Sequence, residues 1–211
     1  MGIHDGLFSS NLRKSAGDVT FTRWKGIPVF KKRVRNVRNP QSDAQMRQRA
    51  KIKALSSIGS LALRAIRLGF KRLASGKSEY NVFSAQNISQ VTGFPDLTAT
   101  VNFPALQFSQ GGLIGINGLG TPAVTGNDVS ISWTAPAATA IDANDEVVFL
   151  ALRKNRANAA DVITNVDKTT GTATVTLPDI QAGDEIETYA FARNPSTGEV
   201  SNTFYGGMVT A

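Results

Sequence analysis

Cations and aromatic residues gather near the start of the chain, and together they could bind nucleic acid. Lysine and arginine side chains neutralise phosphate groups, and aromatic rings stack on bases. Phe21, Trp24 and Phe30 stand among the basic residues of this stretch. The residues that we expect to contact nucleic acid are Arg23, Trp24, Lys25, Lys31, Lys32, Arg33, Arg35 and Arg38. No RNA-recognition, zinc-finger or cold-shock motif accompanies them, so this binding should be independent of base sequence.

Catalytic chemistry has much weaker support. The chain has one histidine, His4, and no cysteine, so neither a Ser–His nor a Cys–His pair can be built on a rigid scaffold. Acids cluster at residues 142–146 and 184–187, in turns and strand edges where solvated carboxylates are the ordinary explanation. The first cluster lacks the glycine and final glutamate of an EF-hand, and the glycine-rich residues 111–120 lack the Lys-Ser/Thr of a phosphate loop. We therefore expect no enzymatic activity, cofactor, metal or small-molecule substrate.

The charge of the chain is divided between two parts. Residues 1–77 hold 18 of the 23 Lys and Arg residues and three acids, a net charge of +15. Residues 78–211 hold the other five bases and 13 acids, a net charge of −8. This division is typical of a protein that grips a polyanion at one end. It fits equally a subunit whose basic part attracts the acidic part of its neighbour, and the sequence leaves both interpretations open.

Three regions are expected to position these residues. Residues 1–41 form a basic arm, in which residues 18–24 and 27–30 should pair as a short hairpin across Lys25-Gly26. An isolated two-stranded ribbon is marginal in water, so the arm should become ordered against a partner. Residues 42–89 should be helical. Residues 90–211 should form an acidic domain whose strands and turns are complete without the arm.

The helical region has two unlike faces. Ser42 and Gln45 match a capping box, Gly59 and Gly69 could break the helix before residue 75, and a second helix should start at Ser78. At the helical period one face carries Arg49, Lys53, Ser56, Ser57, Ser60, Arg64, Arg67 and Lys71. The opposite face is apolar, and it could be either core or an interface between subunits. The predicted assembly-interface residues are Ile52, Leu55 and Ile66.

The remaining residues alternate between short strands and turns. Alternating apolar and polar residues mark the strands, and Gly, Asn, Asp and Pro mark the turns. The predicted strands are residues 128–133, 146–152, 172–177, 185–193 and 201–209, with the last two joined as a hairpin. The expected fold class is α+β, mainly β, with a basic N-terminal arm and a helical segment followed by an antiparallel immunoglobulin-like β-sandwich.

Two resemblances rest on these motifs. Residues 172–192 resemble the E–F corner of a fibronectin type III or immunoglobulin-like domain, which implies that Tyr189 is the tyrosine-corner residue and Trp133 the core tryptophan. Further motifs are the Met-Gly-Ile start, Trp24-Lys25-Gly26, the helix start at Ser42, Ser78-x-Tyr80-Asn81 and Val200-Ser201-Asn202. By these motifs the whole chain resembles a domain-of-unknown-function family of Bacteroidota and their phages. That family implies an architecture and supplies no activity.

These features together favour a non-enzymatic structural protein. We expect a phage virion subunit, in the capsid or associated with it, that is made in the bacterial cytoplasm and assembles with copies of itself and other particle proteins. Its basic arm would contact packaged nucleic acid or neighbouring subunits. The alternative is a bacterial accessory protein associated with nucleic acid or the ribosome. No window of 18 apolar residues and no secretory signal pattern occurs, so no membrane contact is expected.

Overall fold

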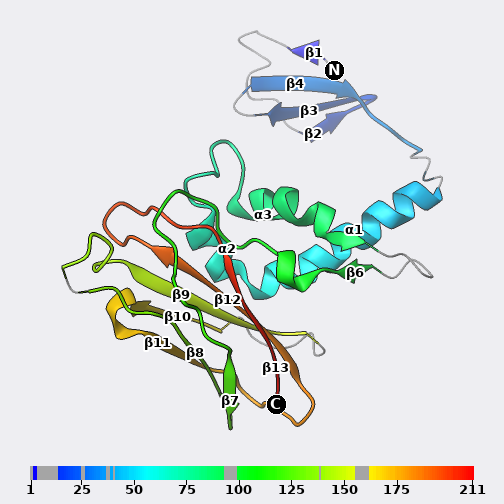
Figure 1. Ribbon diagram of the computed structural model, residues 1–211. Helices are drawn as coiled ribbons and strands as arrows, with labels where there is room; N and C mark the ends of the chain where they lie inside the picture. Colours follow the sequence, from blue (N-terminus) through cyan, green and yellow to red (C-terminus); the bar gives the residue numbers. More distant parts are fainter. Residues whose placement is uncertain are drawn as a thin grey trace. The chain divides into compact units, whose positions relative to one another are not determined.

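The computed structural model describes residues 2–3, 14–24, 27–36, 39, 41–92, 99–137, 139–154 and 162–211. The chain divides into two compact units, Met1–Ser42 and Asp43–Ala211 (Figure 1). The first boundary lies next to the one expected after residue 41. The second expected boundary, between residues 89 and 90, falls inside the larger unit.

The described part of the N-terminal unit is a small antiparallel sheet. Its strands are β1 (Gly2–Ile3), β2 (Lys14–Ala16), β3 (Val19–Trp24) and β4 (Ile27–Lys32), in the order β1-β4-β3-β2. The predicted hairpin is confirmed as the β3–β4 pair, in which Phe21 lies opposite Phe30. Its turn, Lys25-Gly26, lies outside the described residues. Because β1 and β2 flank the hairpin, the unit is a sheet of four strands rather than an isolated ribbon.

Helices open the second unit, namely α1 (Asp43–Leu61), α2 (Leu63–Gly69) and α3 (Glu79–Asn87). The single helix expected for residues 42–75 breaks at Ala62, whose ψ of 19° is not helical, rather than at Gly59. Gly59 instead permits close packing, because a Cβ atom there would lie 2.7 Å from the Tyr80 ring. The predicted start at Ser78 is confirmed, since its hydroxyl accepts a hydrogen bond of 3.2 Å from the Asn81 amide.

Antiparallel strands make up the rest of the second unit. One sheet has the order β10-β9-β12-β13, with β9 (Glu146–Arg153), β10 (Val162–Asp167), β12 (Glu185–Arg193) and β13 (Phe204–Thr210). A second sheet has the order β11-β8-β7, with β7 (Ala123–Thr125), β8 (Asp128–Ser132) and β11 (Thr172–Thr176). β5 (Val91–Thr92) pairs with β6 (Thr100–Val101). Short 3₁₀ turns are η1 (Ile88–Gln90), η3 (Phe103–Ala105) and η4 (Lys168–Thr170).

The predicted α+β class with antiparallel sheets is confirmed. All five expected strands are present, and β12 and β13 pair as the expected hairpin partners. The last strand begins at Phe204, three residues later than predicted. The strands β5, β6, β7 and β10 of this unit were not predicted.

The central strands β9 and β12 of the β10-β9-β12-β13 sheet are buried on both faces, and this joins the helices to the sheets. On one face Leu150, Tyr189 and Phe191 pack in a core with Leu55 and Ile66 of the helices. On the other face a second core contains residues of both sheets, among them Val147, Phe149, Val129, Ile131 and Trp133. Figure 1 shows the helices over one side of β9 and β12, with β8 and β11 on the other. The helical region is therefore part of one unit with the sheets, because its apolar face covers β9 and β12.

The two residues singled out by the immunoglobulin resemblance behave differently. Trp133 is buried in the core between the sheets, and its Nε1 donates a hydrogen bond of 2.7 Å to the Lys168 carbonyl oxygen. Tyr189 belongs to the helix-side core, and its hydroxyl donates to the Phe103 carbonyl oxygen at 2.9 Å. A tyrosine corner bonds to backbone a few residues upstream, whereas Phe103 lies 86 positions earlier. Tyr189 therefore ties η3 to the sheet and is not a tyrosine-corner residue.

Candidate nucleic-acid interface

The basic side chains near the start of the chain face the solvent. Every Lys and Arg that the structure describes between residues 14 and 77 is exposed except Lys51, which is half-buried. Arg35 forms an ion pair with Asp18, and Arg72 forms one with Glu199. Both pairs are themselves exposed, where screening by water leaves an ion pair little strength. The exposure of these side chains leaves them accessible to phosphates.

The arm residues predicted to contact nucleic acid occupy β3, β4 and the segment after β4. Arg23 lies in β3, Lys31 and Lys32 end β4, and Arg33 and Arg35 follow it. Lys31 pairs with Thr20 and Lys32 with Val19, so these neighbouring lysines lie on opposite faces of the sheet. Lys25 and Arg38 lie outside the described residues, and only the backbone of Trp24 is described. The arm therefore presents cations on both faces instead of one patch.

A second basic surface lies on the outer side of α1 and α2. We call it the helix stripe, and its residues are Arg49, Lys53, Ser56, Ser57, Ser60, Arg64, Arg67 and Lys71. All eight are exposed, as the helical period predicted. A shallow groove of about 460 Å³ runs along it, lined by Arg49, Ile52, Lys53 and the three serines. Ser57 and Ser60 donate their hydroxyl protons back to helix carbonyl groups, those of Lys53 and Ser57.

The three predicted interface residues do not share one surface. Leu55 and Ile66 are buried in the core between the helices and the four-stranded sheet, so they are not available to another subunit. Ile52 is 55% exposed and lies at the edge of the helix stripe. The apolar helix face is thus an intrachain core, and Ile52 alone remains at the surface.

The acids of the second unit are largely engaged within the chain. Asp184 and Glu187 are buried, with Asp184 Oδ2 3.2 Å from Arg153 Nε, and Glu187 Oε2 accepting a hydrogen bond of 2.6 Å from the Tyr205 hydroxyl. Burial and this bond raise the pKa of Tyr205. Glu185 forms an ion pair with Lys154, with 2.7 Å between Glu185 Oε2 and Lys154 Nζ. The hydrogen bond between these two side chains raises the pKa of Lys154.

The cluster at residues 142–146 does not converge on one point. Asp142 is paired with Lys168, Asp145 accepts from the Asn194 side chain at 2.9 Å, and Glu146 is 3.2 Å from Arg193. Across the described residues, His, Asp and Glu form no group of three that could hold a metal ion. The exposed acids described after residue 77 are Asp128, Asp167 and Asp179.

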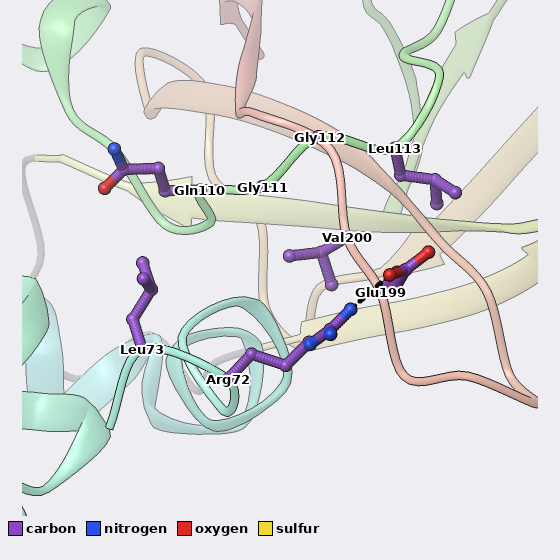
Figure 2. Close-up of a pocket in the computed structure, with 8 residues that line it drawn as sticks. All are labelled: Arg72, Leu73, Gln110, Gly111, Gly112, Leu113, Glu199 and Val200. Carbon is purple, nitrogen blue, oxygen red and sulfur yellow. Dashed lines mark hydrogen bonds and ion pairs between the residues drawn. The ribbon is translucent and has the colours of Figure 1, made fainter. Parts of the chain in front are cut away.

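A further pocket of about 420 Å³ lies between the end of α2, residues 110–113 and the β12–β13 connection (Figure 2). Arg72 and Glu199 form an ion pair within its lining, and they are the charged residues among the described residues that line it. A Cβ atom on Gly111 would lie 2.1 Å from the Val200 carbonyl oxygen, so the backbone packs tightly here. The glycine-rich stretch therefore makes a close packing contact here. This agrees with the sequence, in which the absence of Lys-Ser/Thr argued against a phosphate loop.

Comparison with known proteins places the chain in a family without assigning an activity. No helix in the described ranges has both the length and the apolar composition needed to cross a lipid bilayer. No curated protein matches the chain. A solved fibronectin type III domain, from human fibronectin type III domain containing protein 3, is similar at 17% identity over 46% of this chain and 85% of that one, with a TM-score of 0.29, too low to assign the fold. The model of DUF6266, a family of unknown function, matches residues 11–207, and the chain belongs to that family.

Proposed function

We propose that this protein is a non-enzymatic structural protein of a phage virion, in the capsid or associated with it. In this proposal the arm and the helix stripe hold packaged nucleic acid without regard to its sequence. The two sheets of the second unit form an immunoglobulin-like sandwich that contacts copies of the chain and other particle proteins. The placement in a virion rests on the sequence resemblance to a family of Bacteroidota and their phages. The contact with nucleic acid rests on the surface charges.

The observation that carries the proposal is the different accessibility of the two kinds of charge. The described cations of residues 14–77 are exposed apart from the half-buried Lys51, whereas Asp145, Asp184 and Glu187 are buried and other acids of the second unit have partners within the chain. Exposed cations on two units can neutralise phosphates and release their counterions. Acids that are already paired offer little field to a neighbouring subunit. The protein's positive surfaces are therefore better matched to a nucleic acid than to the acidic part of another copy.

A salt titration tests this proposal. We expect wild-type protein to bind random nucleic acid with an affinity that falls steeply as salt rises, by a log–log slope of about 0.7–0.9 per phosphate contact. Changing Lys31, Lys32, Arg33 and Arg35 to Gln should flatten the slope by up to about three units. The same change at Lys53, Arg64, Arg67 and Lys71 should flatten it independently.

The matched control neutralises acids instead of bases. Changing Asp128, Asp167 and Asp179 to Asn should leave the salt slope nearly unchanged, because these exposed acids do not contact phosphates. If the basic surfaces instead dock on acidic neighbours, this control lowers self-association in sedimentation, while the Gln variants keep the wild-type affinity for nucleic acid. That pair of results would refute nucleic-acid holding.

Electron microscopy of negatively stained protein separates the structural role from the alternative. Rings, shells or filaments, formed alone or on nucleic acid, are expected of a virion subunit. A dispersed monomer that binds nucleic acid would favour an accessory protein associated with nucleic acid or the ribosome.

A further inference from the structure

The strand register of the N-terminal unit places two aromatic rings side by side. Phe21 of β3 lies directly opposite Phe30 of β4, and Lys14 of β2 lies opposite Phe21 on its other side. Directly opposite residues of an antiparallel pair share a face, and their Cβ atoms are about 4.5–5.5 Å apart. The two rings therefore form one continuous aromatic surface with a lysine beside it.

The same face carries two more cations. Side chains alternate along a strand, so Arg23 is on the face of Phe21, and Lys32 is on the face of Phe30. We call Lys14, Phe21, Arg23, Phe30 and Lys32 the phenylalanine face. Its three cations surround the rings, and all three are exposed. The described part of this face contains no acidic side chain.

Residues on the opposite face of β4 differ in their exposure, since Val29 is buried and Ile27 is 42% exposed. Val29 alternates with Phe30 in β4 and is only 3% exposed, whereas Phe30 is 38% exposed and Phe21 is half-buried. The partly exposed Phe30 ring has cations on its own face of the sheet, and such a surface is suited to a ligand that carries both flat apolar rings and negative charge.

We infer that the phenylalanine face binds single-stranded nucleic acid, by stacking bases on Phe21 and Phe30 while Lys14, Arg23 and Lys32 contact the phosphates. This inference rests on the proposed function and names the form of nucleic acid that this site takes. Bases in a duplex are stacked on one another and hidden, so a duplex can offer only its phosphates to this face. A single strand offers both, and stacking on aromatic side chains is tolerant of sequence because every base has a flat face.

The experiment measures binding of full-length protein to three labelled probes, an oligothymidylate, a duplex of equal length and an oligonucleotide of equal length without bases. The substitutions are Phe21→Leu and Phe30→Leu, which keep an apolar side chain and remove the aromatic ring. Base stacking on one aromatic residue corresponds to a loss of about 5- to 150-fold in affinity. We expect each leucine variant to lose affinity for oligothymidylate within that range and to bind the duplex as wild type does.

Two controls keep the result interpretable if a variant folds poorly. Phe30→Tyr should restore oligothymidylate binding, and Ile27→Ala should have no effect, because Ile27 is 42% exposed on the opposite face of the same strand. Wild-type protein, without any substitution, should bind the oligonucleotide without bases more weakly than oligothymidylate by a similar factor. Equal affinity for these two probes would overturn the inference, as would leucine variants that bind oligothymidylate like wild type. If wild-type protein binds none of the probes, the proposed function itself fails.

Discussion

The buried ion pair between Lys168 and Asp142 gives the sharpest test of how the second unit is held together. The Lys168 side chain is 2% exposed, and its Nζ donates hydrogen bonds to Asp142 Oδ2 at 2.7 Å and to the Ile114 carbonyl oxygen at 3.2 Å. The Lys168 carbonyl oxygen also accepts the Trp133 indole proton. One residue thus links the 142–146 turn, the glycine-rich stretch and the core between the sheets.

Asp142→Asn removes the counter-charge while keeping the size of the side chain. The Lys168 ammonium would then be buried with only neutral oxygen partners, and loss of one member of a buried pair lowers the free energy of unfolding by about 3–5 kcal/mol. Lys168→Met should cost less, because the Asp142 side chain is 12% exposed and can be hydrated when left alone. The double variant should be more stable than Asp142→Asn, because replacing both charges removes the uncompensated one.

The pH dependence of stability has a defined sign. A hydrogen bond from Lys168, assisted by its charge, lowers the pKa of Asp142 below its ordinary value of 3.8. A carboxyl group whose pKa is lower in the folded than in the unfolded state stabilises the fold above the unfolded pKa. That contribution disappears as the pH falls through the folded pKa. The free energy of unfolding of the wild type, measured relative to that of the double variant, should therefore fall as the solution is acidified below about pH 4.

Urea unfolding followed by circular dichroism measures these differences through the transition midpoints, at a slope that should be unchanged. In a chain of this size each kcal/mol corresponds to about 2–4 °C of melting temperature, so Asp142→Asn should melt about 6–20 °C lower. If Asp142→Asn lowers the free energy of unfolding by less than about 1 kcal/mol, the Lys168 ammonium must be hydrated or bound by other oxygen atoms. A double variant no more stable than Asp142→Asn would also contradict the reasoning, because the loss would then come from packing rather than charge.

Two further predictions concern packing. Gly111→Ala should destabilise the second unit by about 1–3 kcal/mol in thermal melts, because its Cβ atom would lie 2.1 Å from the Val200 carbonyl oxygen. Its neighbour Gly112 has no atom within 4 Å of such a Cβ, so Gly112→Ala is the matched control and should change stability by less than about 0.5 kcal/mol. A fragment of residues 43–211 should melt cooperatively, whereas residues 90–211 alone should aggregate, because Leu150, Tyr189 and Phe191 lose the helices that cover them. A stable monomer of residues 90–211 would restore the sequence-based expectation that these residues are complete by themselves.

Local sequence patterns predicted the positions of the helices and strands better than they predicted which of these elements pack together. Alternation located β8, β9, β11 and β12 to within a residue, but β7 spans three residues and β10 carries Thr164 and Asn165 in its middle, so neither shows a clear period of two. Helical periodicity identified the apolar face of α1 and α2. It could not show that this face covers β9 and β12, since the partner strands lie about a hundred residues away in the sequence.

The candidate sites show the same limit. The sequence identified the cations of the arm and the helix stripe, because exposed charges need no partner to be recognised. It could not show that Lys168, in a turn with Thr169, Thr170 and Gly171, would be buried, since its burial depends on Asp142, 26 residues earlier. It also grouped Phe21, Trp24 and Phe30 as neighbours without a register, and the pairing of β3 with β4 is what puts Phe21 and Phe30 on one face.

The net charge of +7 understates how strongly this chain should attract a polyanion. The negative charge comes from residues 78–211. Acids there such as Asp184 are buried beside their partners, so they contribute little to the electric field in the surrounding water. The positive charge comes from residues 1–77, whose described Lys and Arg side chains are exposed apart from Lys51, and the two compact units share it. When one unit holds a polymer, the other meets the same polymer at a raised effective concentration, so two modest contacts give a tight hold without any sequence-reading contact. The described acids of a second copy would be largely paired within that copy, whereas a nucleic acid offers one accessible charge per nucleotide along its whole length.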